Sequence, residues 1–216
     1  MFVELIESLR CPRSHEESAL VASATRTESG HIVEGVLGCP VCGAEFRIAN
    51  GVAHFDEPPE PAAVERADAE TAMRIAAFLE LTDGRGFALL CGRWGAHMEY
   101  VLRLTQTPLV LVNPPSGIAL DAAAGVVMAR GAAPFAPDVV RAAALDHGTG
   151  GTGSTGSTFV DSVIRSVRPG GRLLGPASLR VTHGVTEIAR DERMWVGEKT
   201  ATPDSAPRLV SIKRTR

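Results

Sequence analysis

The sequence has no long apolar run, no excess of positive charge and few cysteines. It contains 216 residues, of which 44% are hydrophobic, and no apolar stretch approaches the roughly 20 residues that a membrane-spanning helix needs. The formal net charge is −3, which argues against general electrostatic binding of nucleic acids. We therefore expect an ordinary soluble globular chain, long enough for one domain or for a small module and a medium one.

The beginning of the sequence does not have the pattern of a secretory signal. Its apolar residues are interrupted by Glu4 and Glu7, and no basic segment precedes them. The four cysteines are poorly placed for a disulfide framework, because three lie in the first fifth of the chain and Cys91 stands alone. We expect a cytoplasmic protein whose cysteines serve another purpose.

The distribution of apolar residues predicts two modules joined by a linker. Residues 1–55 are typical of a small β-rich module, with strands expected at 33–37 and 45–48 around a Gly-Cys-Pro turn. Residues 56–74 hold an acidic, proline-rich linker and the start of a helix. The second module is expected over residues 75–216.

Short apolar runs alternate with helical segments throughout the second module. Continuous apolar strands between helices are typical of a mostly parallel sheet, so the predicted fold class is α/β, a doubly wound Rossmann-like sheet preceded by the β-rich module. A glycine- and threonine-rich stretch at 148–158 is expected to be a loop. Strands are predicted at 87–90, 109–112, 126–128, 139–145 and 172–174, with a closing antiparallel pair from 185–188 or 194–196 and 209–212; helices are predicted at 61–81, 96–104 and 159–167.

Three cysteines and one histidine have the spacing of a zinc site. Cys39 and Cys42 form a C-x2-C knuckle followed by glycine, and Cys11 supplies a third thiolate. His15 stands one residue beyond Ser14, which occupies the place of a second cysteine in an upstream knuckle. We predict a zinc site formed by these three cysteines and His15. The alternative is a ribbon that has lost its metal at Ser14 and is held by its core.

Two other histidines, His31 and His54, are weaker candidates for the fourth ligand and are expected at the surface instead.

The sequence around the cysteines matches a known pattern. Residues 9–12 read Leu-Arg-Cys-Pro, residues 38–48 contain the second knuckle followed by Ala-Glu-Phe-Arg-Ile, and residues 50–52 are Asn-Gly-Val. This segment, roughly 5–55, resembles the short zinc-ribbon activators of tRNA and protein methyltransferases, which also occur fused to some bacterial methyltransferases. The resemblance implies that the module binds another protein, with a methyltransferase as one candidate partner, through strand edges and apolar surface.

Three stretches of the second module match positions of another family. Residues 89–95 (Leu-Leu-Cys-Gly-Arg-Trp-Gly) stand where that family has a glycine-rich loop, residues 131–135 follow the third predicted strand, and residues 167–173 lead into the fifth. The module resembles class I S-adenosylmethionine-dependent methyltransferases. The resemblance implies a Rossmann-like fold and a cofactor site at Gly92, Gly95 and Asn113.

Several acceptor groups of that family's cofactor site are missing here. Its acid after the first strand falls among apolar residues 88–90, its acid after the second corresponds to Asn113, and its aspartate after the third corresponds to Ala132. S-adenosylmethionine presents an ammonium group, two hydroxyls and an amine, and each needs an acceptor when buried. Losing three charge-assisted hydrogen bonds, at roughly 1.5–3 kcal/mol each, weakens binding by several powers of ten.

Other candidate chemistry is sparse. His147, which follows Asp146 after the fourth predicted strand, is the one candidate general base, although the start of a polar loop is the favoured interpretation of this residue. Trp94 is expected to plug the vacated cofactor pocket. The sequence therefore predicts a pseudo-methyltransferase that acts as a non-catalytic scaffold or partner-binding subunit. Two alternatives are an active S-adenosylmethionine-dependent methyltransferase with an atypical pocket, in which Asn113 and backbone groups replace the acids, and a small-ligand binder with Trp94 as a stacking platform.

Overall fold

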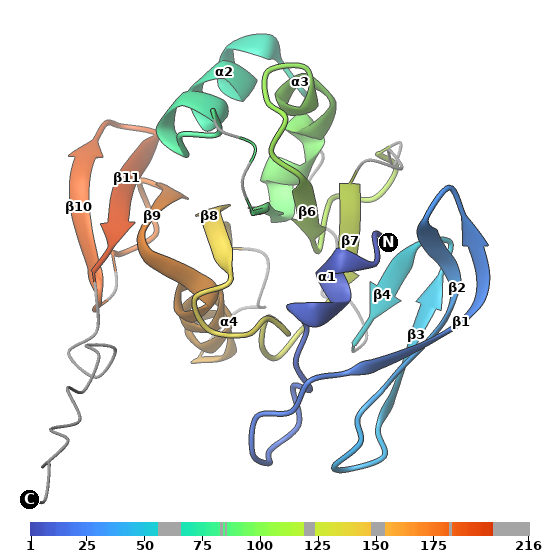
Figure 1. The fold of residues 1–216 in the computed structure, drawn as a ribbon. Coiled ribbons are helices and arrows are strands. Elements are labelled where there is room, and N and C mark those ends of the chain that lie inside the picture. The colour runs from blue at the N-terminus through green and yellow to red at the C-terminus, as the bar shows by residue number, and fades with distance from the viewer. Residues whose placement is uncertain are drawn as a thin grey trace, which may run out of the picture.

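Short runs of Val, Leu and Ala form the central strands of the protein, because their side chains are buried on both faces. The computed structural model describes residues 1–55, 66–82, 84, 86–118, 124–147, 154–181 and 183–200, with residues 154–157 described by their backbone only. These residues form one eleven-stranded sheet in the order β1-β2-β3-β4-β7-β6-β5-β8-β9-β11-β10 (Figure 1). None of the described helices is long and apolar enough to cross a bilayer.

Five parallel strands form the centre of this sheet. From β5 (Ala88–Cys91) the chain adds β6 (Leu109–Val112) and β7 (Ala124–Met128) on one side, then returns to add β8 (Val140–Ala144) and β9 (Val167–Pro176) on the other. The predicted α/β class and its parallel core are confirmed. The connection reverses between β5 and β8, and open α/β sheets bind their ligands at the carboxyl ends of the strands beside such a switch point.

An antiparallel pair closes the sheet. β11 (Met194–Lys199) lies antiparallel between β9 and the edge strand β10 (Val185–Arg190). Both of the alternative segments near residues 185–196 therefore form strands and pair with each other. The third predicted segment, 209–212, lies outside the described residues.

Helices cover the two faces of the sheet. α2 (Ala69–Phe78), the 3-10 helix η1 (Gly92–His97) and α3 (Met98–Leu102) pack on one face, and α4 (Ser154–Ser166) packs on the other (Figure 1). α4 begins within the glycine- and threonine-rich stretch for which the sequence predicts a loop, so that prediction is wrong for residues 154–158. α2 lies within the helix predicted at 61–81 but is shorter, because residues 66–68 and 79–81 are not helical; residues 61–65 lie outside the described part of the chain.

The N-terminal region continues the same sheet. After the short helix α1 (Glu4–Glu7), the strands β1 (Val21–Glu28), β2 (His31–Gly38), β3 (Glu45–Ala49) and β4 (Val52–His54) pair antiparallel in order. β4 then pairs parallel with β7. The boundaries predicted between the modules stay a prediction, but the described sheet runs without interruption from the β-rich region into the parallel core.

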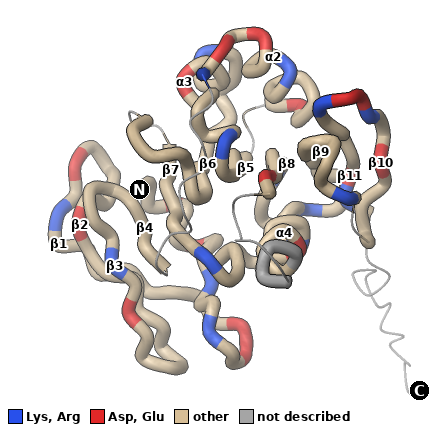
Figure 2. Tube along the Cα trace, turned by 180° about the vertical axis from the view of Figure 1, so that it is seen from behind, with Lys and Arg blue, Asp and Glu red and all other residues tan. Residues whose placement is uncertain are grey.

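Side-chain packing also joins the N-terminal region to the core. Leu5 and Leu9 are fully buried in a cluster that includes Phe135 and the apolar side of α4. The N–H of Arg10 donates to the carbonyl of Pro134 at 2.8 Å. In Figure 2 the acidic and basic positions are interspersed along the trace.

Candidate functional site

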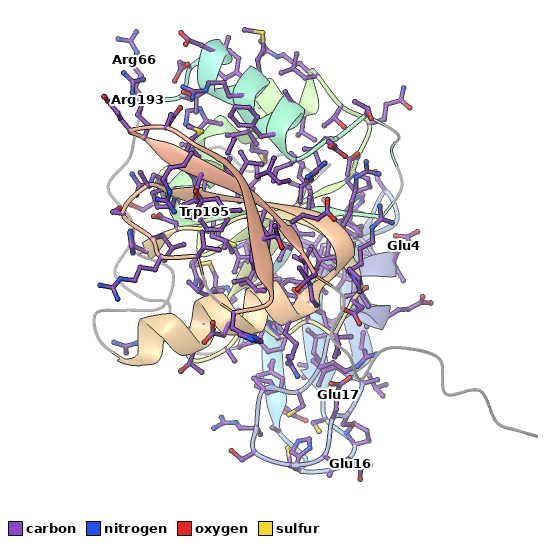
Figure 3. All side chains as sticks on the ribbon, turned by 90° about the vertical axis from the view of Figure 1, so that its left-hand side faces the viewer. Glu4, Glu16, Glu17, Arg66, Arg193 and Trp195 are labelled. Atoms are coloured by element: carbon purple, nitrogen blue, oxygen red, sulfur yellow. The ribbon has the colours of Figure 1, made fainter. Side chains whose placement is uncertain are left out.

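Four potential metal ligands meet at the end of the N-terminal region that lies away from α2 and α3. One pair comes from the loop that carries Glu16 and Glu17, labelled in Figure 3, and the other from the turn between β2 and β3. The ligand atoms of Cys11, His15, Cys39 and Cys42 all lie within 4.8 Å of one another. All four predicted ligands are thus brought together, whereas His31 and His54 are not members of this described cluster.

Two of the spacings between these atoms match those of a tetrahedral zinc site. Zinc bonds of about 2.3 Å to sulfur and 2.0 Å to nitrogen place two sulfurs about 3.8 Å apart and a sulfur and a nitrogen about 3.5 Å apart. The Sγ atoms of Cys11 and Cys42 are 3.8 Å apart, and Sγ of Cys39 is 3.4 Å from Nε2 of His15. All three cysteines are free thiols, so the cluster could hold zinc.

Hydrogen bonds orient the histidine and the second knuckle. Nδ1 of His15 is 2.6 Å from the carbonyl oxygen of Glu16, so Nδ1 carries the proton and the Nε2 lone pair faces the cluster. In the knuckle, the N–H of Gly43 donates to the Cys39 carbonyl, and the Cys39 N–H donates to the Ala44 carbonyl. Gly43 has φ +68°, which glycine adopts without strain.

The three thiols of the cluster differ in acidity. Burial acts to raise the pKa of Cys39, but hydrogen bonds from the backbone N–H groups of Cys42 and Val41 outweigh it and lower this pKa to about 6. Burial raises the pKa of Cys11 to about 11. A thiolate is the metal-binding form of cysteine, so the knuckle favours this form at Cys39 before any metal arrives.

The second candidate site lies at the switch point of the sheet, where the chain's own side chains pack together. The indole N–H of Trp94 donates to the carbonyl of Leu145 at 2.6 Å. Both carboxylate oxygens of Asp146 accept hydrogen bonds from Arg93, one from its backbone N–H at 2.9 Å and one from its Nε at 3.1 Å. Trp94 is 5% exposed and Asp146 is 3% exposed.

The two predicted cofactor-binding glycines face protein atoms. A Cβ on Gly92 would lie 2.3 Å from Oδ2 of Asp146, and Gly92 also has φ +56°. A Cβ on Gly95 would lie 3.0 Å from Cβ of Pro114. Close packing within the chain therefore explains both glycines, and their role in cofactor binding stays a prediction.

Asn113 joins the ends of two neighbouring strands. Its Nδ2 donates to the carbonyl of Ala129 at 2.6 Å, and its Oδ1 accepts the N–H of Ala129 at 2.8 Å. The residue is 4% exposed and has φ +50°. These bonds engage the amide at the carboxyl ends of β6 and β7, where the family resemblance implies a cofactor contact.

His147, the candidate general base, lies at the surface beyond β8. Its Nε2 is 2.9 Å from Oγ of Ser178, which follows β9. One buried polar group that the sequence analysis does not identify is His97, at the end of η1. Its Nδ1 accepts the N–H of Asp68 at 3.4 Å, while its buried Nε2 has no hydrogen-bond partner in the described part of the chain. No spacing pattern pointed to His97.

Comparison with solved structures finds similarity to several methyltransferases. No family model matches the sequence, and no curated protein matches it. Among solved structures, the chain is similar to a candidate S-adenosyl-L-methionine-dependent methyltransferase from Methanococcus maripaludis, with a TM-score of 0.46 and 10% identity over 62% of this chain and 85% of that one.

Two further methyltransferase structures show the same kind of similarity. The 1,6-didemethyltoxoflavin-N1-methyltransferase of Burkholderia thailandensis has a TM-score of 0.37 and 19% identity over 63% of each chain. A geranyl diphosphate methyltransferase has a TM-score of 0.39 and 16% identity over 56% of this chain and 55% of its own. The present chain thus spans less than two thirds of the length of these two enzymes.

Proposed function

We propose that this protein is a non-catalytic, methyltransferase-like subunit that binds another protein through a zinc-holding N-terminal module. The observation that carries the proposal is the packing of Trp94, Arg93 and Asp146 at the switch point. Ligands of open α/β sheets bind at that position. An S-adenosylmethionine molecule there would have to displace a buried tryptophan and an ion pair.

The polar groups around the switch point support the same conclusion. A bound S-adenosylmethionine needs acceptors for its ammonium, hydroxyl and amine groups. Leu89 and Leu90 at the end of β5 supply none from their side chains, and the amide of Asn113 is engaged by Ala129. The carboxylate of Asp146 already accepts two hydrogen bonds from Arg93. A bound cofactor would have to break these internal hydrogen bonds, and the free energy needed to break them would weaken its binding.

Zinc gives the N-terminal module its proposed structural role. Cys11 and His15 precede β1, whereas Cys39 and Cys42 lie between β2 and β3. An ion held by all four would fix these two segments against each other, as structural zinc sites do. No open coordination position remains on a tetrahedral ion with four protein ligands, so the ion would support the fold rather than activate a substrate.

Exposed apolar side chains support a protein partner. Val21 and Val41 are 63% and 62% exposed, and both lie in the N-terminal region next to the ligand cluster. β1 is also one of the two edge strands of the described sheet, so its outward N–H and C=O groups could pair with a strand of another protein.

Retention of proteins from a cell extract of the source organism tests the partner. The zinc-loaded full chain is compared with Val41→Ser, which reduces the exposed apolar surface, and with Ile188→Ser, a matched change at a 51% exposed residue of β10. We expect a protein that the wild type and Ile188→Ser retain and Val41→Ser loses. Equal retention by all three would contradict a partner at this surface.

Mass spectrometry of small molecules released from the purified protein tests the non-catalytic role. We expect no S-adenosylmethionine or S-adenosylhomocysteine above the level released from an unrelated control protein. A near-stoichiometric amount of either would favour the alternative, an active methyltransferase with an atypical pocket.

A further inference from the structure

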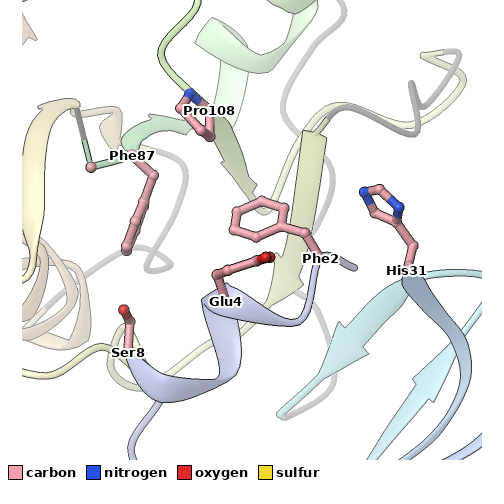
Figure 4. Close-up of a pocket in the computed structure, with 7 residues that line it drawn as sticks. Phe2, Glu4, Ser8, His31, Phe87 and Pro108 are labelled. Atoms are coloured by element: carbon pink, nitrogen blue, oxygen red, sulfur yellow. The ribbon is translucent and has the colours of Figure 1, made fainter. Parts of the chain in front are cut away.

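A cavity lies at the opposite edge of the sheet from the switch point. It has a volume of about 350 Å³ and opens between α1, the beginning of β2 and the amino ends of β5 and β6 (Figure 4). Pockets of roughly 300–1,000 Å³ are typical of small-molecule sites. The cavity is lined by Phe2, Glu4, Ser8, His31, Gly86, Phe87 and Pro108.

The walls of this cavity are aromatic and held in place. Phe87 is 8% exposed and packs against Phe135, with their ring centroids 6.1 Å apart. The backbone of Phe2 forms an isolated antiparallel bridge with His31. Figure 4 shows the Phe2 ring between the Phe87 ring and the His31 ring. These contacts hold the apolar walls in place before a ligand binds, so less conformational freedom is lost on binding.

The polar groups of the cavity favour a ligand that donates hydrogen bonds. Glu4 supplies an exposed carboxylate, which only accepts, and Ser8 supplies a hydroxyl. In the described part of the chain neither side chain has a hydrogen bond or an ion pair. Nδ1 of His31 lies 3.1 Å from the Ser29 carbonyl, so in the neutral ring Nε2 is left as an acceptor. The only formally charged group of the lining is the Glu4 carboxylate.

We propose that this cavity binds a small organic cation, an arylalkyl ammonium, with its ring beside Phe2 and Phe87 and its ammonium group on Glu4. A cation is attracted both by the carboxylate and by the faces of aromatic rings. An anion of the same shape would be repelled by Glu4. The site is separate from the switch point, because Phe87 and Pro108 precede β5 and β6 whereas the switch point follows β5 and β8.

Calorimetric titration of the full chain with three matched compounds tests this site. 2-Phenylethylammonium carries the cation, 2-phenylethanol is its neutral counterpart, and phenylacetate is its anionic counterpart. We expect the ammonium compound to bind at least about threefold more tightly than the alcohol, since an exposed ion pair and a cation–π contact each add a few-fold. Phenylacetate is expected to bind more weakly than both.

Two variants and a control locate the binding. Glu4→Gln should weaken the ammonium compound about twofold to fivefold and leave the alcohol unchanged. Ser8→Phe should fill the cavity and remove binding of both compounds. Glu7→Gln, on the same helix but outside the lining, should change neither. Equal binding of the three compounds, no binding at millimolar concentration, or an unchanged affinity in Glu4→Gln would each overturn the proposal. Glu4→Gln decides the case even if Ser8→Phe fails to fold.

Discussion

The indole N–H of Trp94 donates a 2.6 Å hydrogen bond to the carbonyl oxygen of Leu145, between the ends of β5 and β8. This bond anchors a buried side chain at the position where a doubly wound sheet receives its ligand. The neighbouring residue Arg93 pairs with Asp146 across the same gap. The protein therefore fills the region of the switch point with its own side chains.

Replacing Trp94 should destabilise the protein. We expect Trp94→Ala to lower the free energy of unfolding by about 3–5 kcal/mol, because it leaves a cavity between α2, α3 and the sheet. Trp94→Phe keeps most of the ring but leaves the Leu145 carbonyl without its donor, so we expect a loss of about 1–3 kcal/mol. Urea unfolding measures both. An unchanged stability in Trp94→Ala would show that this side chain does not hold the switch point together.

Zinc binding should depend on His15. We expect about one zinc ion per wild-type chain after purification, and a clear loss of zinc from His15→Ala in competition with a chelating dye. His31→Ala is the matched control, because His31 lies outside the described cluster and should retain the wild-type amount. Zinc content is measured by inductively coupled plasma mass spectrometry. The same affinity in wild type and His15→Ala would remove this histidine from the site.

Lys199 should be important for stability although it belongs to neither candidate site. Its ammonium donates to Asp138 at 2.7 Å and to the carbonyls of Arg165 and Val167 at 2.7 and 2.5 Å, close to the end of α4. Lys199→Met leaves both carbonyls without this donor, so we expect a loss of about 2–4 kcal/mol in urea unfolding.

Asp138→Asn is the control for the ion pair of Lys199. It removes the charge of the exposed partner but keeps the bonds from Lys199 to the two carbonyls, and it should cost about 1 kcal/mol or less. If Lys199→Met is no more destabilising than Asp138→Asn, the two carbonyl bonds contribute little.

The start of α2 should make stability depend on acidic pH. A hydrogen bond from the Thr71 N–H to the Asp68 carboxylate lowers the pKa of Asp68 below its usual value near 4. Because the folded pKa is depressed, the stabilisation is present above the unfolded pKa and is lost as pH falls through the folded pKa. Between pH 5 and 2.5, Asp68→Asn should lose less melting temperature than the wild type, since its amide oxygen caps α2 at every pH. Parallel melting curves would contradict this.

The central strands could be predicted from sequence because both of their faces are buried. The run Leu-Val-Leu-Val at 109–112 coincides with β6, since a strand buried on both faces is an uninterrupted apolar run. The sequence does not predict β1, for the opposite reason. Nearly all of its side chains are exposed, and its pairing with β2 rather than burial holds it in place. Which strand lies beside β4 depends on contacts more than 70 residues away in sequence, and no local pattern encodes them.

The two candidate sites differ in the same way. Cys39 and Cys42 are three residues apart, and the requirement that both sulfurs reach one ion restricts their spacing, so the sequence predicts the cluster. The contacts of Trp94 with Leu145 and of Asn113 with Ala129 join residues 51 and 16 positions apart. Sequence could identify Trp94 as a candidate plug and Asn113 as a candidate ligand, but the atoms that they contact emerge only from the packing of the sheet.

The most direct test of the central claim is a calorimetric titration of the zinc-loaded full chain with S-adenosylmethionine and S-adenosylhomocysteine. We predict no heat of binding up to millimolar ligand, because Trp94, Arg93 and Asp146 already occupy the switch point. Binding of either compound at low micromolar strength would contradict it, restore the enzyme alternative and make Asn113 and His147 the next residues to replace.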